Sequence, residues 1–169
     1  MGVDPFSNVN IPESDANSIY GRLESGENRI RILGPVHEGY VLWQDGKPTR
    51  SKTPIAGDGD DKPKYFCLIP VWMEDEVKFL DLTQKTILTV IQQLNDSEEW
   101  GVTTEYDIII NKQGESLDTT YSVTPCKPSK LGKEAKKAWK EVKDRIDFDG
   151  YIEGGNILTS DDDDDGLPF

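Results

Sequence analysis

Cationic and planar aromatic side chains are interspersed through the first half of the chain. Eight Lys and Arg residues and six Tyr, Phe and Trp residues lie between positions 20 and 72. Binding an unpaired nucleic-acid strand requires both types, because cations follow the phosphates and flat rings stack on the bases. Residues 47–52 (KPTRSK) place three cations in six positions, shortly after Trp43. Since stacking tolerates any base, the pattern predicts a strand-binding surface without sequence preference.

Strand alternation decides which of these side chains share a face. In the strand-like segment EGYVLW, Tyr40 and Trp43 point to opposite faces, so we expect only one of them to stack on bases. Trp43 is favoured because it adjoins the basic turn. Arg29 and Arg31 alternate with two isoleucines in NRIRIL, which places both guanidinium groups on one face. A solvated strand face explains that arginine pair equally well.

The densely apolar segment 64–72 (KYFCLIPVW) is typical of a long central strand. Positions on the parity of Cys67 resemble a core, which predicts that Phe66 and Trp72 face outward. Pro70 cannot donate to a sheet ladder and could reverse that alternation. The predicted contacts with the strand are therefore Arg29, Arg31, Tyr40, Trp43, Lys47, Arg50, Lys52, Lys64, Phe66 and Trp72.

The elements that must position these residues are mainly strands. Strand-like runs occupy 28–33, 38–43, 49–53, 64–72, 77–82, 106–111 and 119–123, and amphipathic helices occupy 83–95 and 131–146. Asp45-Gly46 is a strong hairpin signal. Three strand regions, a helix and two strands predict a five-stranded OB-fold barrel, with the helix between strands 3 and 4 and an extra C-terminal helix. An SH3-like or other small barrel remains open.

Composition divides the 169 residues into three parts. We expect a flexible N-terminal arm at 1–17, a binding domain at 18–146 that includes the last helix, and a flexible linker and acidic tail at 147–169. The formal net charge is −13, but residues 18–133 hold 14 Lys and Arg against 18 Asp and Glu, a net charge of −4. An acidic total ordinarily disfavours nucleic-acid binding. The uneven distribution weakens that objection without removing it.

The C-terminal end carries a second recognition motif. Five consecutive aspartates precede Gly-Leu-Pro-Phe. An aspartate run alone is usually a solvating tail, but here it joins long-range attraction for a basic pocket to a compact apolar anchor. When no strand is bound, the aspartates could also compete with DNA phosphates for the basic groove. The predicted partner-binding tail consists of Asp161, Asp162, Asp163, Asp164, Asp165, Leu167, Pro168 and Phe169.

Residues that would support catalysis or metal binding are sparse. The chain has two cysteines, Cys67 and Cys126, and one histidine, His37, without a CxxC pair. Neither a structural zinc site nor another cofactor is expected. With no catalytic triad or phosphate-binding loop in view, we expect no enzyme activity. No apolar run reaches the roughly 18–20 residues of a membrane span, and no signal peptide opens the chain, which predicts a soluble cytoplasmic protein without a membrane partner.

Two resemblances accompany these patterns. The tail is similar to the acidic C-terminal tip of bacterial single-stranded-DNA-binding proteins, which end in aspartates, an aliphatic residue, Pro and Phe. Residues 20–130 resemble bacteriophage single-stranded-DNA-binding proteins with an OB fold. The matching segments are SGENRIRIL (25–33), EGYVLW (38–43), GKPTR (46–50), KPKYF (62–66), VW (71–72), DLTQKTI (81–87), EWG (99–101), TEYDIIIN (104–111) and TTYSVTP (119–125).

The resemblance implies sequence-independent coating of single-stranded DNA during replication, recombination or repair, in the host cytoplasm if the chain is phage-encoded. It also implies a tail that contacts replication or recombination proteins; self-association on DNA is left open. Two positions depart from the pattern. Cys67 stands where such proteins often carry another aromatic residue, and Gly166-Leu167 stands where bacterial tails usually have Asp-Ile. The main alternative is an acidic adaptor or DNA mimic that binds a host protein and not DNA.

Overall fold

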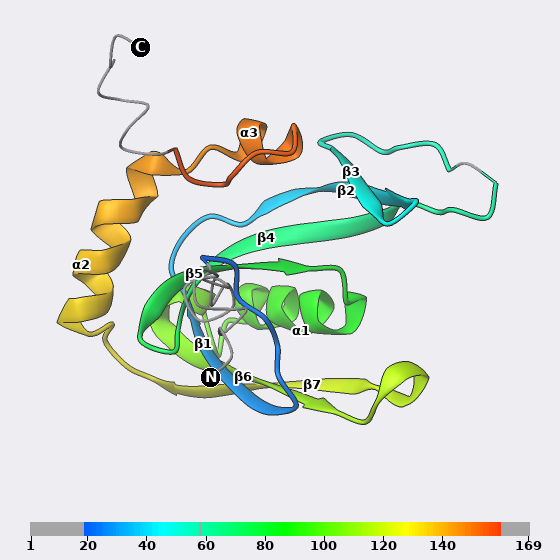
Figure 1. Ribbon diagram of the computed structural model, residues 1–169. Coiled ribbons are helices and arrows are strands. Elements are labelled where there is room, and N and C mark those ends of the chain that lie inside the picture. The colour runs from blue at the N-terminus through cyan, green and yellow to red at the C-terminus, as the bar shows by residue number, and fades with distance from the viewer. Residues whose placement is uncertain (1–18, 58, 160–169) are drawn as a thin grey trace, which may run out of the picture.

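The computed structural model describes residues 19–57 and 59–159 as seven strands and three α-helices (Figure 1). The prediction of a mainly β chain with helices is confirmed. The predicted arm at 1–17 and the tail residues 161–169 lie outside the described residues. The strands are β1 (Gly26–Ile32), β2 (His37–Gln44), β3 (Lys47–Ser51), β4 (Lys64–Met73), β5 (Glu76–Leu82), β6 (Tyr106–Gln113) and β7 (Thr120–Pro128), and the helices are α1 (Lys85–Asp96), α2 (Lys133–Val142) and α3 (Phe148–Ile152).

Strand β4 is the centre of the sheet. The order is β3-β2-β4-β1-β6-β7, with β5 on the other edge of β4, and the paired strands are antiparallel. The first half of β4 pairs with β2, whereas Val71 and Trp72 pair with β1. Two branches therefore leave the same edge of β4. One is the hairpin β2–β3, and the other is β1–β6–β7.

The prediction of a five-stranded barrel is wrong, because the sheet has seven strands and does not close. Within the described residues, no ladder joins β5 to β7. The outer edge of β5 is instead occupied at Phe79, whose backbone bonds to Ile19 at 2.7 Å and to Gly21 at 2.9 Å. The residues around Ile19 carry no strand pattern, so this pairing was not predictable from alternation.

One face of β4 packs against α1. Cys67, Ile69 and Val71 point into this main core, which α1 completes with Ile87 and Ile91. The prediction that the parity of Cys67 is the core parity is therefore confirmed. The helix follows the expected 3.6-residue period and buries a single stripe against the sheet.

The other face of β4 is buried as well, under the C-terminal segment. Phe66 and Leu68 are 0% exposed and pack with Phe79, Tyr151 and Ile157. The prediction that Phe66 faces outward is therefore wrong. A strand buried on both faces has a nearly continuous apolar sequence, which is what residues 64–72 show.

Residues 147–159, predicted to belong to a flexible linker, form α3 and a loop that folds back beneath it. The Asp147 carboxylate accepts from the Gly150 N–H at 3.0 Å and caps α3. The backbone N–H of Asp147 donates to Ile157, and that of Thr159 donates to Arg145, at 2.6 and 2.9 Å. The linker prediction is wrong because this segment is ordered by long-range packing and has no periodicity of its own.

Candidate nucleic-acid interface

The hairpin β2–β3 forms an arm at one end of the sheet (Figure 1). Asp45 and Gly46 adopt φ values of 52° and 76°. A two-residue type I′ turn needs left-handed backbone at both central positions, which Asp-Gly supplies at low cost. The register pairs Gln44 with Lys47. The predicted Asp-Gly hairpin is thus confirmed.

One face of the arm brings together several of the predicted residues. Arg50, Val41 and Lys64 lie directly opposite one another across β3, β2 and β4. Directly opposed residues of antiparallel strands point to the same face. Trp43 lies two residues from Val41, shares that face, and is 51% exposed. Lys47 is exposed at the tip, but it lies opposite Gln44 and so belongs to the other face of the hairpin.

Arg50 lies at the border between this open face and the C-terminal segment. Its Nη2 is 3.1 Å from the Asp81 carboxylate, and its guanidinium lies 4.7 Å from the centroid of the Tyr151 ring. A guanidinium over an aromatic face is a cation–π contact. Lys52, the next cation along the chain, forms an ion pair with Asp149 of α3. The basic face is therefore partly open and partly covered by α3.

The opposite face of the same strands borders a groove of about 870 Å³ between β2, β4 and α1. Tyr40 and Tyr65 meet there edge to face, with ring centroids 5.7 Å apart. The ionisable groups along the groove include Glu38, Lys85 and Asp96, two carboxylates against one ammonium. That balance disfavours phosphates. Tyr40 points away from the basic face, as predicted, and we leave it out of the proposed contact surface.

A short polar chain runs along this groove. The Tyr65 hydroxyl donates to Glu38 at 2.5 Å and accepts from the Cys67 thiol at 3.4 Å. Burial raises the pKa of Tyr65 and the pKa of Cys67 above their ordinary values. Cys67 is therefore held as a protonated, hydrogen-bonded thiol.

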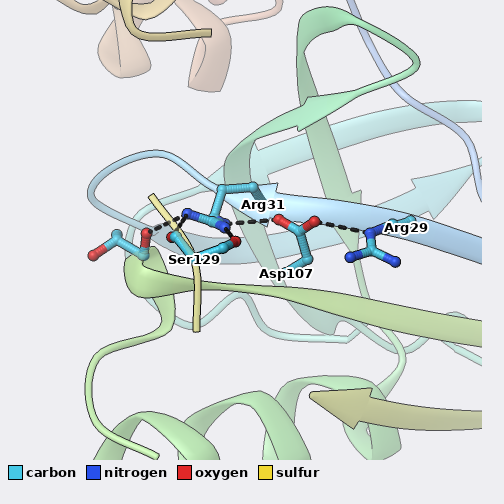
Figure 2. A network of polar contacts seen from close by, with 5 residues as sticks. Arg29, Arg31, Asp107 and Ser129 are labelled. Carbon is cyan, nitrogen blue, oxygen red and sulfur yellow. Dashed lines mark hydrogen bonds and ion pairs between the residues drawn. The ribbon is translucent and has the colours of Figure 1, made fainter. Parts of the chain in front are cut away.

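Arg31 has a structural role. Figure 2 shows its guanidinium between Asp107 and Ser129. It donates to the Asp107 carboxylate at 2.7 Å, to the Ser129 hydroxyl at 2.7 Å and to the Thr104 carbonyl at 3.3 Å. Its side chain is 4% exposed, whereas that of Arg29, on the other oxygen of Asp107, is 62% exposed. Of this predicted pair, only Arg29 presents its charge to solvent, and it lies on the other branch of the sheet from the arm.

Trp72 lies at the far end of β4 from the arm. It lines a shallow hollow with Asp75, Glu76 and Glu141. Three carboxylates beside one ring make an unfavourable environment for a phosphate chain. We therefore leave Trp72 outside the proposed surface.

Sequence reasoning missed His37, Asp81 and Tyr151, which meet the basic face from β2, β5 and α3. The His37 ring stacks on Phe148 with centroids 4.8 Å apart, and the Tyr151 hydroxyl donates to Asp81 at 2.5 Å. Burial lowers the pKa of His37, and the positive charge of Lys52 lowers it further. The only available signal was the aromatic pair in FDGYI, which has no strand or helix period to mark it.

No family model, curated protein or solved structure matches the chain. Among residues 19–57 and 59–159, no helix has the length and apolar character needed to cross a membrane. The same part of the chain holds no group of three or more His, Cys, Asp or Glu side chains placed to bind a metal ion.

Proposed function

We propose that the chain binds single-stranded DNA without sequence preference through the basic face of the arm. The observation that carries this proposal is the row Arg50–Val41–Lys64 with the half-exposed Trp43 beside it. Cations at the ends of a cross-strand row can follow phosphates while the indole stacks on a base. The predicted residues Trp43, Arg50, Lys52 and Lys64 form this surface. Lys47 pairs with Gln44 and so lies on the other face of the hairpin tip, and Arg29 is a peripheral contact on the other branch.

The strand connections support an OB-like arrangement for this proposal. β1 pairs with both β4 and β6, and α1 lies between β5 and β6. In OB folds the helix likewise follows the third main strand, and oligonucleotides bind across the sheet and its adjoining loops. In this comparison, β1 and β2 act as the two halves of one bent first strand, and β3 belongs to the loop that follows it.

The proposed role is to coat and protect single strands during replication, recombination or repair, in the cytoplasm of a host cell and without catalysis. The residues predicted to recruit partner proteins, Asp161 to Asp165 and Leu167 to Phe169, form the tail. The resemblance to bacteriophage and bacterial single-stranded-DNA-binding proteins supports both parts of this role. The acidic adaptor is the second candidate, favoured by the net charge of −13.

The direct test is quenching of tryptophan fluorescence by oligo-dT, measured at two salt concentrations with duplex DNA as control. We expect quenching by the single strand that weakens with salt, because phosphate contacts release counterions. Trp43→Ala should weaken binding by about 1–3 kcal/mol, the usual contribution of one stacked base. Absence of binding at low salt, also after removal of residues 161–169, would contradict the proposal and put the adaptor first.

A pair of lysine variants separates a local contact from a general effect of charge. Lys64→Ala should lower affinity and reduce the salt slope by about one, because one phosphate contact is lost. Lys130→Ala removes the same charge from an exposed position between β7 and α2 and serves as control. Equal losses in both variants would mean that the arm is not the binding surface.

A further inference from the structure

The part of the basic face next to the arm is covered by residues 147–159, which we call the strap. The strap consists of α3 and the loop after it, and α3 lies over β2 and β4 (Figure 1). It is fastened at its far end by the Ile157 N–H, which donates to the Tyr20 hydroxyl at 3.1 Å. The strap contacts the sheet mainly through side chains, since its backbone hydrogen bonds run within the strap and to Arg145 and Tyr20.

Aromatic rings of the strap stack on rings and on a cation of the sheet. Phe148 lies parallel to His37, with centroids 4.8 Å apart and planes 19° apart. The Arg50 guanidinium lies 4.7 Å from the centroid of Tyr151 and 5.6 Å from that of Phe66. The strap therefore places its rings against a ring face and a guanidinium, two kinds of group that also stack on nucleic-acid bases.

Acidic and hydroxyl groups accompany these rings. The Asp149 carboxylate forms an ion pair with Lys52, although both side chains are more than half exposed. The Tyr151 hydroxyl and Arg50 Nη2 meet on one oxygen of Asp81, at 2.5 and 3.1 Å. Arg50 Nε is buried and has no hydrogen-bond partner among the described residues. A buried N–H donor without a partner is costly, and a phosphate oxygen is an acceptor that suits it.

We propose that His37, Phe66, Arg50 and Lys52 form a second, covered subsite for one base and its phosphate, and that the strap is its internal occupant. In the strap, Phe148 stands in for the base and Asp149 for the phosphate. Arg50 belongs both to this subsite and to the row Arg50–Val41–Lys64 on the arm, so the two surfaces adjoin. The inference rests on the proposed function and adds its regulation: a bound strand displaces the strap.

The construction of the strap suits displacement. α3 has five residues, well below the roughly 12–15 at which an isolated helix becomes even marginally stable, so it exists only while it is docked. Gly150, Gly154 and Gly155 increase the freedom that the strap regains on release. A base of the bound DNA strand then covers Phe66 in place of the strap. The apolar surface of Phe66 is therefore not left exposed to water.

Hydrogen exchange on the full-length protein tests displacement directly. The amides of Tyr151, Ile157 and Thr159 are hydrogen-bonded in the strap and should exchange slowly without DNA. Saturating oligo-dT should raise their exchange by about tenfold or more if the strap is released. Binding of oligo-dT with unchanged or slower exchange at these amides would overturn the inference while leaving the proposed function intact.

Variants of the strap give an independent readout. Phe148→Ala/Asp149→Ala removes the ring and the carboxylate that occupy the subsite, and should tighten oligo-dT binding by about tenfold, as expected when a mostly closed site is opened. Glu98→Ala removes one negative charge from an exposed position after α1 and controls for net charge. Equal affinity of the strap variant and the control overturns the inference. No binding by any variant overturns the proposed function together with it.

Discussion

Cys67 and Cys126 differ in their surroundings, which predicts different reactivity at the scale of single residues. Burial is the main cause that raises the pKa of Cys67, and nearby Glu38 and Asp81 add to it. Only the thiolate reacts with alkylating reagents, and each unit by which a pKa rises lowers the thiolate fraction about tenfold. Cys126 is partly exposed. At neutral pH we expect two alkylation phases, the slower one from Cys67.

Single variants assign the two phases. Cys126→Ser should leave only the slow phase, which should speed up as the pH rises, and Cys67→Ser should leave only the fast one. If Cys126→Ser retained the fast phase, the buried thiol would be reactive and the assignment would be reversed.

His37 makes packing under the strap sensitive to acid. Its pKa is lowered below the ordinary 6.5, chiefly by burial and secondly by Lys52. The folded state therefore binds the proton less readily than the unfolded state, so this contribution to stability is complete above about pH 6.5 and is lost as the pH falls below it. Since the chain has one histidine, its NMR signals report the titration alone. We expect a midpoint below 6.5 that rises toward 6.5 in Phe148→Ala; a wild-type midpoint above 6.5 contradicts the assignment.

Residue types predicted that the arm is basic and aromatic, but they did not predict which individual side chains are exposed and which are buried. Trp43 is exposed beside the basic turn, as expected from its position. Arg29 and Arg31 have the same alternation in sequence, yet only Arg31 is buried, because its guanidinium meets Ser129 from 98 residues away. Contacts of that range leave no trace in local spacing. Phe66 was misplaced for the same reason, since its cover is Tyr151.

At the scale of elements, Gly39 of β2 leaves room for the ring of Phe66, its partner on β4. A Cβ atom there would lie 2.9 Å from the Phe66 ring and 2.9 Å from the Ser51 carbonyl oxygen. Phe66 is fully buried, and the Ser51 oxygen is backbone, so neither can yield without disturbing the sheet. Gly39→Ala should lower the free energy of unfolding by about 1–3 kcal/mol, as overpacking usually does.

Urea denaturation measures this loss. Gly132→Ala is the matched control, because no atom lies within 4 Å of the added Cβ and its φ of −63° suits alanine. Its cost should stay at the fraction of a kcal/mol expected for a helix N-cap change. Equal stability of the two variants would show that β2 and Phe66 can separate freely.

Helices and strands with a clear hydrophobic period were predictable from the sequence. The way in which the strands pair with one another was not. The helix expected at 83–95 is Lys85–Asp96, and the one expected at 131–146 is Lys133–Val142 followed by a 3-10 turn. The strand expected to end before Pro125 continues to Pro128. Proline is tolerated there because β7 is an edge strand, which among the described residues pairs with β6 alone. The sheet stays open because residues near Tyr20 pair with the outer edge of β5 at Phe79. No local sequence pattern predicts that pairing.

For the whole molecule, the uneven charge predicts self-inhibition by the acidic tail. Deleting residues 161–169 takes five aspartates from a chain of net charge −13 and leaves the strap, which ends at Thr159, in place. We expect oligo-dT affinity to rise, mainly at low salt, because charges are screened beyond about 30 Å at 0.01 M but beyond about 10 Å at 0.1 M. Replacing the five aspartates with asparagine should act similarly at unchanged chain length.

The tail and the strap would act by different physics, which allows them to be told apart. Tail removal should change affinity in a salt-dependent way and leave amide exchange in the strap unaltered, because the tail acts through charge. Loosening the strap should change affinity at both salt concentrations, since stacked rings are not screened. If tail deletion left low-salt affinity unchanged, charge competition would be excluded and the strap would be the sole internal competitor. If tail deletion instead raised both the affinity and the amide exchange at Tyr151 and Ile157, the tail would be holding the strap closed. The tail and the strap would then form a single inhibitory element.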